Sequence, residues 1–352
     1  MALTLTSLTQ LSGLGFDTVI DVRSPAEYSE DHLPGAVNLP VLDNEERARI
    51  GTIYKQQSAF LARKQGAALV ARNAALHLEG KLADKPGGWR PLVYCWRGGQ
   101  RSGSFASILQ QVGWRAELVE GGYKSWRALV VAELGERPVA APVVVLDGNT
   151  GTAKTDILGL LAARGVQTID LEGLAHHRGS LFGHRAEGQP SQKAFEGRLA
   201  MALATLDPAC PVVIEAESSR IGNLTLPKQI WAAMKAAPRL RIAAPLAARA
   251  EYLARAYVDL TEDRQRLMDV VQALRHAHPA ERIGQWVAMA QSGAFVDLAE
   301  ALMRDHYDQR YEKHRARSTA VDTAFETESL APEALQVLAD RLAAHLSGMA
   351  KP

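Results

Sequence analysis

Short apolar runs alternate with longer amphipathic stretches along the chain, and this pattern predicts interleaved strands and helices. In the first half, strands bounded by turn residues are expected at residues 17–24, 33–40 and 90–95. Helical spacing occupies residues 44–80 and 104–113, and residues 116–130 repeat the order strand, turn, helix. Ser24 followed by Pro25 marks the start of a short helix, because serine caps a helix and proline suits its first turn.

The regular pattern is interrupted at residues 133–142, where two prolines and a glycine remove any clear period. Beyond this linker, strands are expected at residues 142–148, 166–173, 210–218 and 238–246. Residues 247–314 and 332–346 are mainly helical. We therefore predict two α/β domains with largely parallel sheets, over residues 1–137 and 138–352, the second carrying helical additions.

Composition supports two ordinary globular domains. The 352 residues exceed the length at which a single core stops growing, and the chain is 47% hydrophobic and 22% charged. Its formal net charge of +1 means that nucleic acid would have to bind through a local basic patch. Two cysteines are too few for a disulfide framework. The start of the chain has no signal-peptide pattern and no apolar run is long enough to span a membrane, so we expect a cytoplasmic protein without a membrane partner.

The strand predicted at residues 90–95 ends on Cys95, and a loop rich in glycine and arginine follows it. Ligands of α/β sheets gather at the carboxyl ends of the strands, where Cys95 is expected. The anion cradle would consist of Trp96, Arg97, Gly98, Gly99, Gln100, Arg101 and Ser102. Glycines let backbone N–H groups converge on an anion, and the arginines and the following helix favour a thiolate. We predict that Cys95 is the catalytic residue, whereas Cys210 lacks such a loop and is expected to be structural.

A second glycine loop follows the apolar strand predicted at residues 142–148 and precedes a helix. It resembles a P-loop and consists of Gly148, Asn149, Thr150, Gly151, Thr152, Ala153, Lys154 and Thr155. The backbone would wrap phosphates, Lys154 would neutralise them and Thr155 is placed to reach a metal ion. Ala153 stands where glycine is usual, and alanine disfavours the positive φ that such a loop demands.

Between the strands of the second domain lies a stretch, residues 171–199, that is dense in polar side chains and only weakly periodic. Long loops beside a phosphate-binding loop are often functional. The candidate substrate residues are Arg178, Ser180 and Gln192 from this stretch, with Glu215 and Glu217 from the strand at 210–218. Either glutamate could hold Mg²⁺ through water or could be a solvated strand end. The histidines of the stretch lack the spacing of a zinc site, and we expect no protein-bound metal site.

Residues 21–40 (DVRSPAEYSEDHLPGAVNLP), followed later by the cysteine loop, resemble a rhodanese domain, the fold of sulfurtransferases. Five residues separate Cys95 from Arg101, one more than in simple thiosulfate sulfurtransferases and the same spacing as in cysteine phosphatases. This resemblance implies a phosphate-like anion in the loop, and selenophosphate would qualify. Asp21 and Arg23 are expected to form a buried structural charge pair, since buried charges need partners.

Several motifs together resemble those of the bacterial tRNA 2-selenouridine synthases over essentially the whole chain. They are YCWRGGQRS (94–102), DLEGLAHHRGSLFG (170–183), QPSQKAFE (189–196), IEAESSRIG (214–222) and DHYDQRYEK (305–313). The resemblance implies replacement of sulfur by selenium in the 2-thiouridine of the tRNA wobble position. It implies selenophosphate as donor and a geranylated thiouridine, made from geranyl diphosphate, as intermediate. We assign selenophosphate to the Cys95 loop and the diphosphate to the P-loop.

Two other functions fit the residues. One is a plain rhodanese-type sulfurtransferase or cysteine phosphatase with a fused kinase-like domain, which would process a small anion without RNA. The other is a tRNA-binding or sulfur-relay adaptor without catalysis. For tRNA, the candidate patch is residues 304–317, where cationic residues alternate with two tyrosines, although interleaved acidic residues also suit a solvated helix face.

Overall fold

The computed structural model describes residues 2–185, 187–315 and 321–349. It divides into two compact units. The first unit comprises Met1–Glu136 and Pro190–Thr205, and the second comprises Arg137–Gln189 and Leu206–Pro352. The sequence pattern gave no indication that residues 190–205 group with the first unit.

The first unit is built on a parallel sheet in the order β1-β5-β4-β2-β3. Its strands are β1 (Ala2–Leu3), β2 (Thr18–Asp21), β3 (Val37–Asn38), β4 (Pro91–Tyr94) and β5 (Glu117–Val119). The register places Asp21, the last residue of β2, beside Tyr94, the last residue of β4. The segment after β4 therefore emerges next to the segment after β2, at the carboxyl edge of the sheet.

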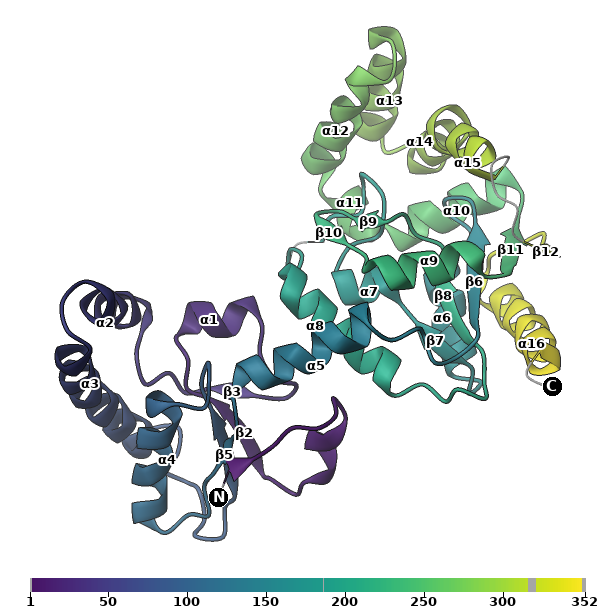
Figure 1. Cartoon of the computed structure of the whole chain (residues 1–352). Helices are drawn as coiled ribbons and strands as arrows, with labels where there is room; N and C mark the ends of the chain where they lie inside the picture. The colour runs from purple at the N-terminus through teal and green to yellow at the C-terminus, as the bar shows by residue number, and fades with distance from the viewer. Residues whose placement is uncertain (1, 186, 316–320, 350–352) are drawn as a thin grey trace. The chain divides into compact units, whose positions relative to one another are not determined.

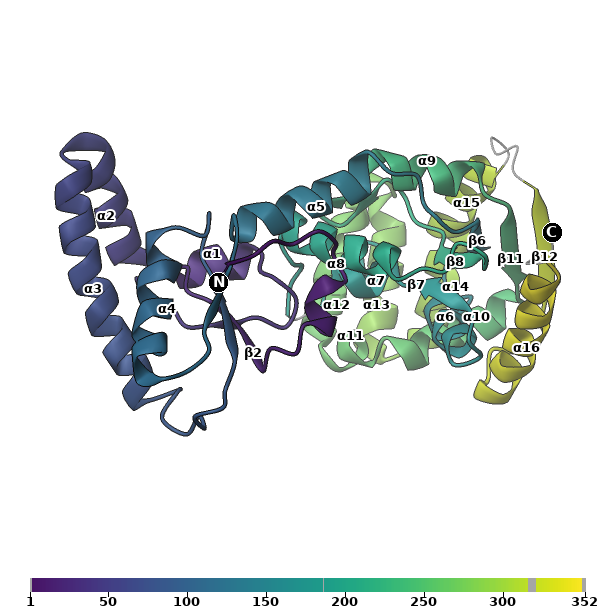
Figure 2. The ribbon, with the colours of Figure 1, turned by 60° about the horizontal axis from the view of Figure 1, so that its bottom comes forward.

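Helices and one 3₁₀ turn complete the first unit. They are η1 (Gln10–Gly13), α1 (Pro25–Glu30), α2 (Asn44–Gln56), α3 (Ala59–Glu79), α4 (Gln100–Val112), α5 (Tyr123–Gly135) and α8 (Gln192–Ala204). The start of α1 is as predicted: Ser24 and Glu27 form a capping box and Pro25 occupies the first turn. Helices α2 and α3 lie side by side (Figures 1 and 2), and α3 packs on α4. The core between the sheet and these helices includes Ile20, Val93 and Phe105.

The second unit has its own parallel sheet in the order β12-β11-β6-β8-β7. The strands are β6 (Val143–Gly148), β7 (Gln167–Ile169), β8 (Val212–Glu215), β11 (Arg239–Ala243) and β12 (Asp322–Glu326), and β9 (Arg220–Ile221) pairs with β10 (Leu224–Thr225) in a separate hairpin. The predicted pair of α/β folds with parallel sheets is thus confirmed. The edge strand β12 was not predicted, because Ala324 and Phe325 are its only apolar residues.

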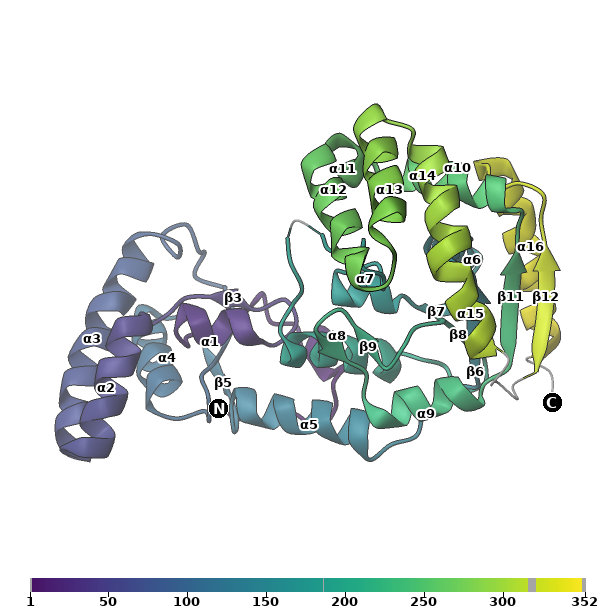
Figure 3. The ribbon, with the colours of Figure 1, turned by 90° about the horizontal axis from the view of Figure 1, so that it is seen from above.

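Helices of the second unit fall into two groups. Around the sheet lie α6 (Lys154–Ala162), α7 (Leu171–Ala175), α9 (Lys228–Ala236) and α16 (Pro332–Met349). A helical group follows β11: α10 (Leu246–Ala256), α11 (Val258–Glu262), α12 (Arg264–Gln272), η2 (Ala273–His276), α13 (Ala280–Ser292), α14 (Phe295–Leu302), the π-helical turn η3 (Met303–Tyr307) and α15 (Asp308–Arg315). Figure 3 shows α12 and α13 side by side and β11 beside β12. Each group has its own apolar core, one containing Leu146 and Leu338, the other Leu267 and Trp286.

None of the helices in the described part of the chain is long and apolar enough to cross a lipid bilayer.

Candidate functional site

Cys95 lies directly after β4, in the loop that leads to α4, and is 4% exposed. Its Sγ accepts hydrogen bonds from the Gly99 backbone N–H at 3.3 Å and from the Ser102 hydroxyl at 3.2 Å. Both donors belong to the first turn of α4, whose dipole adds positive potential at the same place. Two donors and a helix N-terminus thus surround the sulfur, as is typical of the site of a nucleophilic cysteine.

The loop after Cys95 is held in shape by the start of α5. The carbonyl oxygens of Cys95 and Trp96 accept hydrogen bonds from the backbone N–H groups of Tyr123 and Lys124, at 2.8 and 3.0 Å. This close approach is possible because Gly122 has no side chain: a Cβ there would overlap the carbonyl oxygen of Cys95. Sequence analysis missed Gly122, although the Gly-Gly pair before α5 was its signal.

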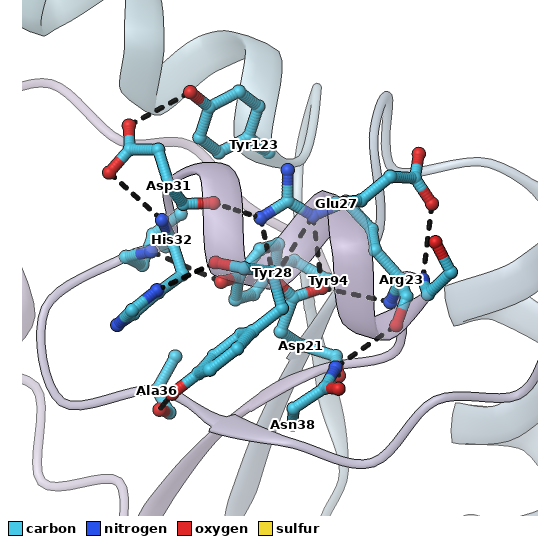
Figure 4. Close-up of polar contacts among 12 residues, drawn as sticks. Asp21, Arg23, Glu27, Tyr28, Asp31, His32, Ala36, Asn38, Tyr94 and Tyr123 are labelled. Carbon is cyan, nitrogen blue, oxygen red and sulfur yellow. Dashed lines mark hydrogen bonds and ion pairs between the residues drawn. The ribbon is translucent and has the colours of Figure 1, made fainter. Parts of the chain in front are cut away.

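Below the loop lies the buried charge pair that the sequence predicted (Figure 4). Arg23 and Asp21 are at most 1% exposed, and their closest atoms are 2.6 Å apart. The Arg23 guanidinium also donates to the Asp31 carbonyl at 2.6 Å and lies 4.1 Å from the centre of the Tyr123 ring. Burial lowers the pKa of Arg23, but the bond to Asp21 outweighs it and the pKa is raised overall. The pair is therefore structural, and it supports the cysteine loop because Arg23 packs against the rings of Trp96 and Tyr123.

A second buried carboxyl extends this network. The Asp31 carboxylate accepts hydrogen bonds from the Tyr123 hydroxyl at 2.8 Å and from the His32 backbone N–H at 2.9 Å (Figure 4). Burial raises the pKa of Asp31 and these two bonds offset it only in part. Tyr123 contacts both Arg23 and Asp31. Through that one side chain, the start of α5 is tied to the loop that precedes β3.

The two arginines of the cysteine loop differ in their surroundings. Arg101 forms a two-point ion pair with Glu27, at 2.6 and 3.2 Å, whereas Arg97 is exposed. Burial raises the pKa of Glu27, but the hydrogen bond and charge of Arg101 outweigh it and the pKa is lowered. Arg101 thus joins the cysteine loop to α1. Gln100 and Gly99 are exposed beside it, so the rim of the loop is open to an incoming ligand.

The P-loop motif has the expected context: it connects β6 to α6. Two of its residues adopt positive φ, Gly151 at 83° and Ala153 at 57°. Ala153 is buried and left-handed, so the backbone takes the glycine-type conformation despite its methyl group. Such a residue costs about 1–2 kcal/mol relative to the right-handed region. The departure seen in the sequence has therefore not altered the path of the loop.

Side chains beneath the P-loop hold it in place. The Arg249 guanidinium donates to the Thr150 carbonyl at 3.1 Å and forms a two-point ion pair with Asp308 at 2.9 and 2.7 Å. Asp308 also accepts a hydrogen bond from the Asn149 amide at 2.9 Å. Arg249 is 6% exposed. This Arg249–Asp308 clamp was not predicted, because its members lie on α10 and α15, far from the loop in sequence.

Carboxyl groups surround Lys154, the lysine that is predicted to bind phosphate. Lys154 Nζ donates to the Gly148 carbonyl at 3.1 Å. Burial lowers its pKa, but the charges of Tyr311 and of Glu172, Glu217 and Glu215 outweigh it, so the pKa is raised and the lysine stays cationic. The Thr155 hydroxyl donates to the Glu172 carboxylate at 3.2 Å.

Two of these carboxyl groups hold protons more tightly than usual. Burial, together with the charge of Glu172, raises the pKa of Glu215 well above its usual value and that of Glu217 to about 8. The Glu215 carboxyl accepts from the Glu172 backbone N–H at 2.6 Å. Among the described residues, no three His, Cys, Asp or Glu side chains are arranged to hold a metal ion. Glu217 is thus a group that can exchange a proton near neutral pH beside Lys154.

These groups line a cavity of about 460 Å³ over the P-loop. It brings together Thr150 to Thr155 of the loop with Arg178, Ser180 and Glu217 from the candidate substrate residues. Glu215 lies behind the wall, and Gln192 begins α8 and groups with the first unit. Further cationic side chains on the wall are Arg185, Arg239 and Arg310, which sequence analysis did not place there.

The candidate tRNA patch, residues 304–317, overlaps this wall. Tyr307, Arg310 and Tyr311 line the P-loop cavity. Arg304 forms an ion pair with Asp305 at 3.0 Å. Residues 316 and 317 lie outside the described part of the chain. The described members of this stretch therefore include residues that line the P-loop cavity, and tRNA binding through the stretch stays a prediction.

Known protein families match both parts of the chain. A rhodanese-like domain model matches residues 4–129, and a model described as the tRNA 2-selenouridine synthase AAA domain matches residues 141–280. A tRNA 2-selenouridine synthase of Chromohalobacter salexigens is 39% identical over 250 residues, covering 68% of this chain and 65% of that protein. One from Alcanivorax borkumensis is 33% identical over 326 residues, covering 84% of this chain and 88% of the relative.

A third relative, from Hahella chejuensis and also named tRNA 2-selenouridine synthase, is 33% identical over 335 residues and is covered to 84% of its length. These matches extend across the cysteine-loop unit and the P-loop unit alike. The chain belongs to the tRNA 2-selenouridine synthase family.

Proposed function

We propose that this protein replaces the sulfur of a wobble 2-thiouridine in tRNA by selenium, in two steps at two anion-binding loops. Selenophosphate is the selenium donor, and a geranylated thiouridine made from geranyl diphosphate is the intermediate. Family membership supports the overall reaction. The observation that supports the division into two steps is that only the first loop places a cysteine among anion-stabilising donors, whereas the second offers phosphate-binding groups without a thiol.

The first step takes place at the P-loop. The thiouridine sulfur attacks C1 of geranyl diphosphate, the C1–O bond breaks, diphosphate leaves, and the base loses its N3 proton. Lys154 and the arginines of the cavity offset the charge that develops on the departing diphosphate. Glu217, with its pKa near 8, is placed to exchange the released proton.

The second step takes place at the Cys95 loop. The selenium of selenophosphate attacks C2 of the geranylated base, the C2–sulfur bond breaks, and geranylthiol departs with a proton from the donor. Alkylation matters because it turns sulfur into a thiol that can leave. Cys95 acts as a nucleophile: its thiolate attacks the phosphorus of the selenium-bound phosphoryl group, the selenium–phosphorus bond breaks to leave 2-selenouridine, and water hydrolyses the phosphocysteine to phosphate and the free thiol.

The decisive experiment compares Cys95→Ser with Lys154→Ala on tRNA substrates, by mass spectrometry of the nucleosides. With thiolated tRNA, Lys154→Ala should form neither product, whereas Cys95→Ser should accumulate the geranylated nucleoside. With pre-geranylated tRNA and selenophosphate, Lys154→Ala should regain selenouridine and Cys95→Ser should not. Selenation by Cys95→Ser, or none by a folded Lys154→Ala on the pre-geranylated substrate, would refute the division of labour.

A further inference from the structure

A second cavity adjoins the P-loop cavity within the helical group of the second unit. It measures about 80 Å³, room for about six water molecules. Its wall is made of apolar side chains apart from a few hydroxyls, and the large apolar members include Phe182, Leu260, Leu267, Phe295, Leu298 and Leu302. Water in such a space would find few hydrogen-bond partners, so the cavity suits a hydrocarbon.

The two cavities meet at a shared set of residues. Thr150, Ser180, Leu253, Tyr257 and Tyr307 line both. Thr150 belongs to the phosphate loop itself, so the apolar space begins where the phosphate site ends. The hydroxyls of Tyr257 and Tyr307 both interact with Ser180, and burial raises the pKa of Tyr257 to about 12. The hydroxyls of Ser180, Tyr257 and Tyr307 stay neutral and lie at the boundary between the charged cavity and the apolar one.

Two alanines keep the apolar cavity open. Ala254 on α10 and Ala299 on α14 are the smallest side chains of its wall, and these two helices pack against each other. The surrounding core is otherwise filled by large apolar residues such as Leu267 and Trp286. Unfilled space in a core lowers stability, by an amount that grows with its volume. A cavity beside the P-loop that is left open at this cost has the properties of a ligand subsite.

We propose that this apolar cavity receives the hydrocarbon chain of a prenyl diphosphate whose phosphates lie in the P-loop, and that its walls at Ala254 and Ala299 limit the length of that chain. The inference rests on the proposed function and adds a specificity determinant to it. A nucleotide fits the combined site poorly, because a purine needs hydrogen-bond partners along its edge and the apolar wall supplies only threonine, serine and tyrosine hydroxyls.

The test changes the cavity and leaves the phosphate site intact. Ala299→Phe fills the apolar space. The matched control is Val296→Phe, which adds the same ring on α14 at a position that is 40% exposed. Transfer to tRNA is measured as kcat/KM for dimethylallyl, geranyl and farnesyl diphosphates, and inorganic diphosphate binding is measured by calorimetry. Each additional buried carbon is worth up to about fourfold in affinity.

Wild type should prefer geranyl over dimethylallyl diphosphate by about 100-fold, from the five additional carbons that it buries. Ala299→Phe should abolish this preference and leave the binding of inorganic diphosphate unchanged, while Val296→Phe should behave as wild type. Leu298→Ala, which enlarges the cavity, should raise the relative use of farnesyl diphosphate. If Ala299→Phe does not fold, as judged by circular dichroism, Ala299→Leu takes its place with a smaller shift in the same direction.

Unchanged chain-length preference in folded Ala299→Phe and Leu298→Ala proteins, with geranyl transfer intact, would overturn the subsite and leave the proposed function standing. If wild type transfers no prenyl group, or binds ATP or GTP more tightly than geranyl diphosphate, the proposed function fails as well. The two failures are thus distinguishable within one set of measurements.

Discussion

The two loops that we propose as anion-binding sites are held in shape by different contacts. Each follows a parallel strand at its carboxyl end and precedes a helix, so each offers converging N–H groups. The Cys95 loop rests on the compensated Asp21–Arg23 pair, and its sulfur already has two donors. In the P-loop, Lys154 donates to the loop's own Gly148 carbonyl and lies among the carboxyl groups of Glu172, Glu215 and Glu217. In the first loop the donors already point at the cysteine sulfur. In the second loop, Lys154 must give up its hydrogen bond to the Gly148 carbonyl before it can bind a phosphate.

The largest expected effect concerns the Cys95 loop. Gly122→Ala would drive a methyl group into the Cys95 carbonyl, so we expect selenation to fall more than about 100-fold and the free energy of unfolding to drop by about 3 kcal/mol. Gly135→Ala, in the same helix with open space around it, is the control and should be neutral or slightly stabilising. Geranylation should persist in Gly122→Ala. Assays of both nucleosides, with urea unfolding, check this; equal loss of both products would contradict the independence of the loops.

The second effect concerns the clamp under the P-loop. Arg249→Met removes one partner of a buried ion pair and leaves Asp308 uncompensated, which should cost about 3 kcal/mol of unfolding free energy and weaken diphosphate binding. Arg241→Met breaks the more exposed pair with Asp322 on neighbouring strands and should cost less than about 1 kcal/mol. Chemical unfolding and calorimetry measure both. Equal losses in the two variants would show that the clamp does not support the loop.

A smaller effect is expected at Ala153. For Ala153→Gly, relief of the left-handed conformation gains about 1–2 kcal/mol, and loss of a buried methyl with greater backbone entropy costs a similar amount. The variant should therefore unfold within about 0.5 kcal/mol of wild type. Ala153→Val should lose more than about 2 kcal/mol, because a β-branched residue tolerates this conformation worst. A loss above about 1.5 kcal/mol in Ala153→Gly would show that the strain is absent.

The smallest effect is a dependence on pH. Since the pKa of Glu217 is raised to about 8, the folded state holds its proton more tightly than the unfolded state does. Stability from this group is complete below the usual glutamate pKa and is lost as pH rises through about 8. Glu217→Gln should therefore match wild type in Tm near pH 4.5 and exceed it at pH 9. Glu328→Gln, at an exposed position, is the control. A Tm difference that shrinks as pH rises would reverse the assignment.

The sequence predicted those strands and loops that a local pattern of residues determines. Strands β2, β4, β6 and β8 are apolar runs ending in turn residues, and both loops follow such runs. What it missed depends on residues brought together from a distance. Strand β12 is weakly apolar and is placed by its register against β11, some 80 residues earlier. Arg249 and Tyr307 join the P-loop site from separate helices, so no spacing in the sequence signals them.

Ala153 shows the opposite case. The sequence identified the departure from glycine and the positive φ at stake, but the loop keeps its conformation because it is anchored elsewhere, by Arg249 at Thr150. A local preference of about 1 kcal/mol loses to several tertiary hydrogen bonds. The alanine at position 153 therefore indicated that the backbone would be strained, but it did not indicate that the loop would keep the left-handed conformation.

The grouping of α8 with the first unit has a consequence for biosynthesis. Helix α8 packs on α5, where Arg127 pairs with Glu196, yet the chain between those helices belongs to the second unit. The first unit is therefore incomplete until residue 205 has been synthesised, by which time β6, α6 and β7 already exist as nascent chain. A truncated product ending at the apparent linker would leave the α5 face uncovered. Neither unit of this protein can therefore be obtained by cutting its gene at one place.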